Sequence, residues 1–460
     1  MMPEDNDKPG ETLANASEDV ASPPREKPQG EEKPAPEERK GGSSWKPALI
    51  LTIAFYVIYG LAFNTRLLKP SPDNHFVYQA DAFLNKQLNL TRPPPHGNDW
   101  VKYDNKWYVS FPPLPAIMMM PGVKIWGYKF NDRLFTFFFT PLPILFLFLA
   151  LERLRKKERI KTSMRENIGL SILFGAGTVY FFVAVQGSVW FTAQVIGTSL
   201  LACYIYFALD GRRPLLAGLF LGLGFLCRTP VCFAFPLLVY EVLRAADKPE
   251  RFYGWILKIF EWKHLQKFLL FAIFPAAIVV FAMVINTMRF DSPFEFGHRH
   301  LNVLWTSKFS KWGLFNYHFL ARNLATVFTL LPWLSRIPPY ITISNHGLAI
   351  WFTTPVLLYL LWPRLRGGLH TALWISVVCV AALSLFYQNT GWVQFGYRFS
   401  IDYMLFLVML LAAGGRKLTK TFWSLVAVGI IINLFGAVTF GRISQFYSSD
   451  RTQLEIFQPD

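Results

Sequence analysis

Long apolar segments alternate with polar links along most of the chain. A helix needs about 20 apolar residues to cross a bilayer, and many of these segments approach that length. The pattern predicts about eleven transmembrane helices, at 47–64, 133–151, 167–185, 190–209, 214–228, 230–243, 268–287, 347–362, 369–387, 401–415 and 419–440. The short pair 214–228 and 230–243 meets at a proline and could instead form one kinked helix plus an interfacial piece. We therefore expect an all-α polytopic membrane protein.

Two long polar regions interrupt this pattern, at about 65–132 and 289–346. In the first, Ser71 and Pro72 are predicted to be the N-cap and first position of a helix that continues toward Leu90. Asp73 would then lie in the first turn, where the helix dipole keeps a carboxylate ionised. The amphipathic spacing that follows is typical of a helix on a membrane surface.

Shorter elements are predicted in the same regions. Alternation of apolar and polar residues over 101–111 indicates a small hairpin. Segment 111–127 is apolar but short and broken by prolines, so we expect a re-entrant or surface helix. A second surface helix is expected over 317–334.

The N-terminal segment 1–46 is rich in Pro, Glu, Lys, Gly and Ser and has almost nothing apolar to bury. Such a composition predicts a disordered tail, followed by one membrane domain over 47–460. No cleavable signal peptide precedes the first apolar segment, so we expect an uncleaved signal anchor at 47–64.

Basic residues cluster in the links at 153–165, 212–213, 244–267, 364–366 and 416–420. The positive-inside rule places these links, and with them the N-terminus, in the cytosol. The same clustering explains the net charge of +16 without nucleic acid, which we exclude as a partner. The four cysteines lie in apolar segments without zinc-site spacing, so neither a disulfide framework nor a cysteine metal site is expected.

Polar chemistry gathers on the outer face that this topology defines. Asp73 is either a general base that takes a proton from an acceptor hydroxyl or a carboxylate that only caps its helix. Asp81 and His75 share the predicted helix and would at most support Asp73. His75 has no partner at ligand spacing, so we expect no metal site.

Three arginines on this face are candidates for binding the phosphate of a lipid. Arg228 lies near the membrane boundary and needs an anion, either a protein carboxylate or a phosphate. Arg398 ends GWVQFGYR and stands four residues before Asp402, so a helical ion pair is the alternative to phosphate binding. Arg299 is a third cationic position, or only part of a solvated loop.

Motifs of other enzyme classes are missing from the sequence. There is no glycine-rich nucleotide loop, no Ser/His/Asp signature and no HExxH. We therefore expect no nucleotide chemistry and no cofactor. The groups left as candidates for chemistry are an outer-face carboxylate and several arginines, above an apolar helix bundle.

These residues resemble the GT-C superfamily of membrane glycosyltransferases. Within it, the chain is most similar to bacterial relatives of protein O-mannosyltransferases and lipid A aminoarabinose transferases. The segments that carry the resemblance, in chain order, are 73–84, WYVSFPPLP at 107–115, 131–134, 228–230 and GWVQFGYRFSID at 391–402. Many relatives have an acidic pair after the first span, whereas here Asn74 follows Asp73.

The resemblance implies transfer of a sugar from a polyprenyl-phosphate-linked donor to a lipid, glycan or protein acceptor. It places the reaction at the outer (periplasmic or extracellular) face of a bacterial inner membrane, with Asp73 as base and arginines on the donor phosphate. One carboxylate is enough for an inverting displacement. A lipid phosphate leaves as a stable anion, so no second acid is needed to protonate it. A transporter or flippase of a lipid-linked glycan is the alternative, and a non-catalytic assembly protein is a third possibility.

Overall fold

The computed structural model describes residues 44–244, 257–303 and 306–448, which belong to the unit Gly42–Asp460. Of the predicted N-terminal tail, only 44–46 are described, and α1 already begins at Trp45. The rest of that tail and most of the basic link between 244 and 257 lie outside the described residues.

Six helices of the described part are long and apolar enough to cross a membrane. They are α1 (Trp45–Phe63) with η1 (Asn64–Leu68), α4 (Asp132–Phe137) with α5 (Leu142–Lys156), α8 (Val189–Ala208) with η3 (Leu209–Gly211), α12 (Trp262–Phe290), α16 (Gly368–Phe386) and α18 (Lys420–Thr439). The chain is therefore a multi-pass helical membrane protein, as its hydrophobic pattern predicts.

The other five predicted spans are helical but shorter or broken. They are α6 (Met164–Ala176) with α7 (Tyr180–Ala184), α9 (Pro214–Phe225), η4 (Thr229–Ala234) with α10 (Pro236–Leu243), α15 (Ile350–Thr353) with η7 (Pro355–Leu361), and η8 (Arg398–Ser400) with α17 (Ile401–Ala413). Proline explains two of the breaks, since Pro236 and Pro355 each open a new helical segment. Full spanning length is thus confirmed for six of the predicted helices.

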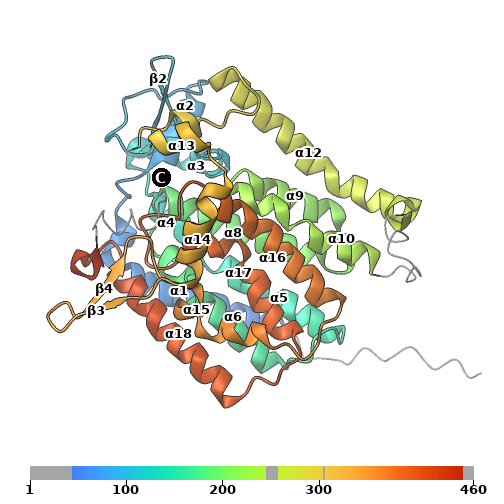
Figure 1. Ribbon diagram of the computed structural model, residues 1–460. Helices are drawn as coiled ribbons and strands as arrows, with labels where there is room; N and C mark the ends of the chain where they lie inside the picture. Colours follow the sequence, from blue (N-terminus) through green and yellow to red (C-terminus); the bar gives the residue numbers. More distant parts are fainter. Residues whose placement is uncertain (1–43, 245–256, 304–305, 449–460) are drawn as a thin grey trace, which may run out of the picture. The chain divides into compact units, whose positions relative to one another are not determined.

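A layer of short elements covers one end of the helices (Figure 1). It contains α2 (His75–Leu84), β1 (Val101–Tyr103), β2 (Lys106–Tyr108), α3 (Leu114–Trp126), η2 (Gly127–Lys129), η5 (His298–His300) and α13 (Thr306–Trp312). The hairpin is confirmed, with Val101 opposite Tyr108 in an antiparallel pair. We call this layer the Asp73 end of the bundle.

The second polar region supplies the remaining elements. They are η6 (Tyr317–Phe319), α14 (Leu320–Phe328), β3 (Trp333–Leu334) and β4 (Ile341–Ser344), with η9 (Ser444–Phe446) and β5 (Tyr447–Ser448) from the end of the described chain. The helix predicted over 317–334 therefore ends at Phe328, before the β3 strand. Strand β4 pairs antiparallel with β3 and parallel with β5.

Helix α17 lies at the centre of the core. Nearly every residue from Ile401 to Ala412 is buried, as expected for a helix that is apolar all round. Buried tyrosines form hydrogen bonds between neighbouring helices. The Tyr59 hydroxyl of α1 donates to Gly175 O of α6 at 2.9 Å, and the Tyr180 hydroxyl of α7 donates to Thr140 O, just before α5, at 2.7 Å. This packing gives the Asp73 end a rigid support.

Helix α12 has a different environment, since most of its apolar side chains are exposed. It packs on α9 through glycines: a Cβ at Gly218 would lie 2.0 Å from Phe271 O. Small residues are what allow two membrane helices to approach this closely.

Candidate active site at the Asp73 end of the bundle

Asp73 lies in a loop just before α2, not in its first turn. The N-cap is Asn74, and the first turn of α2 contains no acidic residue. The predicted cap at Ser71 is wrong because Ser71 has another partner: its N–H donates to Asp132 Oδ1 at 2.7 Å and its hydroxyl to Oδ2. Asp73 O in turn accepts from the Val189 N–H at 3.0 Å, which ties this loop to the start of α8.

The Asp73 carboxylate contacts His96, with 3.5 Å between Asp73 Oδ1 and His96 Nε2. Both side chains remain partly open to solvent, 25% and 32% exposed respectively. Burial raises the pKa of Asp73, and the charges of His96 and Arg133 partly oppose that rise. A carboxylate with a raised pKa and an accessible edge is suited to accept a proton.

His75 holds the loop that carries His96. Its ring stacks on Trp100 with 3.9 Å between centroids and an angle of 13° between planes. Burial lowers the pKa of His75 to about 3, so the ring is neutral at physiological pH. Its Nε2 then donates to Asn98 O at 3.1 Å. Stacking and this hydrogen bond therefore fix the loop that carries His96 against α2.

Asp99, in the same loop, is a further candidate for the site. Its Oδ2 accepts from Trp190 Nε1 at 2.8 Å. Burial raises the pKa of Asp99; Trp190 and the charge of Arg398 oppose this, while the charge of Asp73 adds to it. Asp99 thus stands within electrostatic range of both Asp73 and Arg398. Its only local signal is the turn-rich stretch HGND at 96–99.

Arg228 and Arg398 flank one aromatic ring. Their Cζ atoms lie 5.3 Å and 5.6 Å from the centroid of Phe399. The anion that Arg228 needs is a protein carboxylate. Arg228 binds Asp402 through two nitrogens, with Nε at 3.2 Å from Oδ1. Asp402 therefore pairs with Arg228 across two helices, not with Arg398 along its own helix.

Arg398 is left with free donor capacity. Its Nε donates to Gly391 O at 3.0 Å, and its Cζ lies 5.2 Å from the Phe191 ring centroid. Across the described residues, neither terminal nitrogen has a hydrogen-bond or ion-pair partner. Of the three predicted phosphate-binding arginines, Arg398 is thus the one with an unpaired fork beside the acidic residues.

Two predicted candidates lie apart from this group. Arg299 has a side chain that is 73% exposed and 3.7 Å from Glu295. Asp81 accepts from the Tyr128 hydroxyl at 2.6 Å and from Thr91, in a separate hydrogen-bond network toward the other end of α2. The structure brings neither of them to Asp73.

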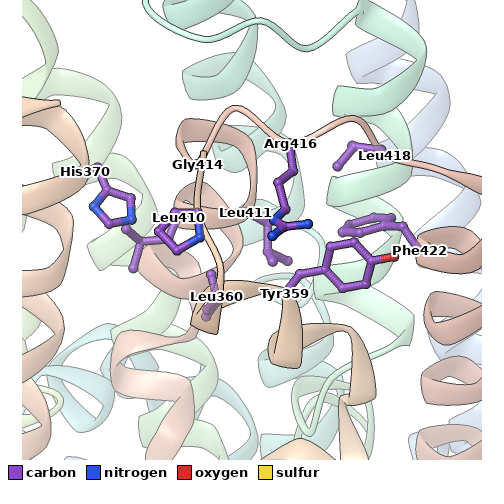
Figure 2. Close-up of a pocket in the computed structure, with 10 residues that line it drawn as sticks. Tyr359, Leu360, His370, Leu410, Leu411, Gly414, Arg416, Leu418 and Phe422 are labelled. Carbon is purple, nitrogen blue, oxygen red and sulfur yellow. The ribbon is translucent and has the colours of Figure 1, made fainter. Parts of the chain in front are cut away.

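No cluster of three His, Cys, Asp or Glu side chains with metal-binding geometry occurs among the described residues. A small cavity lies at the other end of α17 from Asp402, between the ends of α16, α17 and α18 (Figure 2). Arg416 and His370 are its polar lining residues besides Tyr359, and no carboxylate lines it. The acidic and basic groups at the Asp73 end therefore form the candidate site.

The fold and this site define a multi-pass membrane protein with an acid and arginine cluster at one bundle end. The structure is similar to ArnT from Cupriavidus metallidurans bound to undecaprenyl phosphate, with a TM-score of 0.45 and 12% identity over 85% of this chain and 64% of that one. It is also similar to the Archaeoglobus fulgidus oligosaccharyltransferase in its apo form, with a TM-score of 0.42 and 13% identity over 88% and 57%. A further structure, AglB from Archaeoglobus fulgidus with an inhibitory peptide and a dolichol-phosphate, gives 0.41 and 12% over 88% and 57%.

These similarities extend over most of this chain, and the resemblance to GT-C glycosyltransferases stays a prediction. The chain spans less than two thirds of the length of each of these proteins. No protein-family model matches the sequence, and no curated protein matches it either. At this level of identity, no residue role is transferred from those structures.

Proposed function

We propose that this protein is a membrane glycosyltransferase. It transfers a sugar from a polyprenyl-phosphate-linked donor to a lipid, glycan or protein acceptor at the outer face of a bacterial inner membrane. The observation that carries the proposal is the grouping of a partly exposed carboxylate, Asp73, with a histidine at 3.5 Å. Asp99 lies within electrostatic range of both Asp73 and Arg398, and the terminal nitrogens of Arg398 have no partners among the described residues.

The proposed reaction is an inverting displacement at the anomeric carbon. Asp73 takes the proton of an acceptor hydroxyl while the acceptor oxygen forms its bond to that carbon. The bond between the anomeric carbon and the donor phosphate oxygen breaks, and polyprenyl phosphate leaves with the electron pair. Asp73, whose carboxylate is itself partly exposed, then releases the proton to water.

Arg398 is the residue we assign to the leaving phosphate. A guanidinium fork with free nitrogens matches two phosphate oxygens, and it stabilises the negative charge that develops on them. Arg228 is already neutralised by Asp402, so we assign it to holding Phe399 and the neighbouring Arg398 in place. The exposed Arg299 stays a weaker candidate for the same phosphate.

Asp99 adds a second carboxylate to this proposal. Trp190 Nε1 donates to its Oδ2, and Arg398 lies within electrostatic range. In this position Asp99 can accept a hydrogen bond from a sugar hydroxyl or orient Arg398. Many relatives have a second acidic residue next to the base, where this chain has Asn74. In the proposed site, Asp99 takes the place of that second carboxylate from a loop further along the chain.

The test is sugar transfer by the purified protein in liposomes supplied with a panel of radiolabelled polyprenyl-phosphate monosaccharides. We expect the turnover of Asp73→Asn to be about 100-fold lower or more, because the asparagine amide cannot accept the proton. The matched control is Asp81→Asn, which changes the same functional group in the separate Tyr128 network and should retain turnover. If labelled lipid crosses the bilayer equally with wild type and Asp73→Asn while no donor is consumed, the protein is a flippase instead.

A further inference from the structure

Three arginines meet where three membrane-spanning segments end. Arg66 is in η1, at the end of the first span, and Arg133 is in α4, at the start of the second. Arg442 follows directly after α18, the last span of the described chain. These segments come from both ends of the chain, and their ends lie on the same side as Asp73. We call the three residues the arginine triad.

Packing brings the triad together. A Cβ at Gly441 would lie 3.9 Å from both terminal nitrogens of Arg66, so the Arg66 guanidinium rests on the turn that carries Arg442. The Arg133 Nη1 is 3.5 Å from the Arg66 carbonyl oxygen. The guanidinium groups are partly buried and therefore less well solvated than in water. Their like charges also repel one another.

No residue of the triad has a salt-bridge partner within the described residues, although the charges of Asp132 and Asp73 attract Arg133 at longer range. No carboxylate oxygen lies within 4.0 Å of any of the three guanidinium groups there. The nearby Asp132 carboxylate is occupied by the N–H and hydroxyl of Ser71. Backbone carbonyls alone accept from the triad, including Gln186 O at 3.3 Å from Arg133 Nε and Ala62 O at 2.6 Å from Arg442 Nη2.

Donor atoms within the triad are also left without partners. Arg66 Nη1 and Arg442 Nε are buried, and neither has a hydrogen-bond partner in the part of the chain that the structure describes. Arg133 as a whole is only 7% exposed. An unpaired charge at a membrane boundary costs free energy unless an anion balances it, and here three share one place. Guanidinium groups on neighbouring segments, with free N–H donors, are the usual surroundings of a bound phosphate.

We propose that the arginine triad binds one phosphate group, and that its natural source is the headgroup of a membrane lipid. The position supports a lipid, because all three side chains sit at the ends of spans, at the depth of headgroups. The site is separate from the one at Arg398: its residues come from other elements and none of them contacts Phe399. The proposal stands whether or not the protein transfers a sugar.

The test is thermal unfolding of the delipidated full chain in detergent, titrated with dioleoyl phosphatidylglycerol. A ligand that binds the folded state raises Tm in proportion to its occupancy. Dioleoylglycerol, which has the same chains without phosphate, is the control lipid, and sodium phosphate tests the free anion. We expect stabilisation by phosphatidylglycerol and little by dioleoylglycerol. Sodium phosphate that stabilises and blocks the lipid effect would identify the free anion as the ligand of the same site.

The variant Arg66→Gln/Arg442→Gln should weaken phosphatidylglycerol binding at least about tenfold, because two charged hydrogen-bond donors are lost. Lys69→Gln/Lys86→Gln removes the same charge from exposed positions at the same end and should bind as wild type does. Arg398→Gln should also keep the lipid, which separates this site from the proposed active site.

Folding is not a confounding factor in this design. Without lipid, Arg66→Gln/Arg442→Gln removes repelling charges, so its Tm should equal or exceed that of wild type. Arg66→Lys/Arg442→Lys keeps the charge without the fork and should bind with intermediate affinity. Equal stabilisation by dioleoylglycerol, unchanged binding in the glutamine variant, or an equal loss in the lysine-to-glutamine control would each overturn the proposal.

Discussion

The Asp73 carboxylate is tuned by the residues around it. Burial raises its pKa, while the positive charges of His96 and Arg133 hold it down. A general base works only when deprotonated, so activity should fall as the pH drops through the pKa of Asp73. Removing a neighbouring positive charge should raise the pKa of Asp73, so activity should then begin to fall at a higher pH.

His96→Gln is the variant that tests this dependence. We expect the acidic limb of the kcat/KM profile to move to higher pH, since the carboxylate loses a charge that favours its ionised form. Turnover above the new pKa should fall less than in Asp73→Asn, because the base itself is still present. A limb at the wild-type position would show that His96 does not interact with the group that titrates.

The ion pair between Arg228 and Asp402 makes a second prediction at this scale. Asp402 is 1% exposed, so Asp402→Asn leaves a guanidinium without its partner in the bundle. Breaking a buried pair in this way typically costs about 3–5 kcal/mol. We expect a marked fall in Tm for Asp402→Asn, and recovery of most of it in Arg228→Leu/Asp402→Leu. If the double variant is no more stable than the single one, the pair is not the source of the loss.

At the scale of elements, the contact between α9 and α12 depends on a glycine. A side chain at Gly218 has no room, because the backbone of Phe271 already occupies the position of its Cβ. Gly218→Leu should therefore separate the two helices and lower the Tm of the detergent-solubilised protein by several degrees. Gly367→Ala is the control, since a Cβ there meets nothing within 4 Å. Equal melting of both variants would contradict a tight interface.

Elements also show how far local patterns carry a prediction. The β1–β2 hairpin and the apolar helices follow from alternation and hydrophobicity within single segments, and both are confirmed. The cap at Ser71 was beyond such reasoning, because its true partner, Asp132, is distant in sequence. The pairing of Arg228 with Asp402 and the placement of Asp99 beside Trp190 are likewise tertiary contacts. Sequence patterns thus named Asp73 and Arg398 as candidates but did not show the groups that surround them.

The orientation of the whole molecule is a further prediction. Positive-inside counting puts the basic links in the cytosol and the Asp73 end outside. A single cysteine introduced at the exposed Lys86 should react with a membrane-impermeant maleimide in intact spheroplasts, and one at the exposed Lys420 should react only after lysis. The native Cys203 and Cys227 are buried, whereas Cys232 and Cys379 are partly exposed and are replaced by serine before the labelling cysteine is introduced. The reverse labelling pattern would place the candidate site in the cytosol.

The candidate site combines groups that lie far apart along the chain. Asp73 follows the first span, whereas Arg398 precedes the penultimate helix. During synthesis, a nascent chain that has inserted its early helices already displays the carboxylate but has no cation to receive a leaving phosphate. If the protein has the proposed function, it should stay inactive toward its donor until its last helices have entered the membrane. A prematurely terminated chain would then be inert rather than a hydrolase that wastes activated sugar.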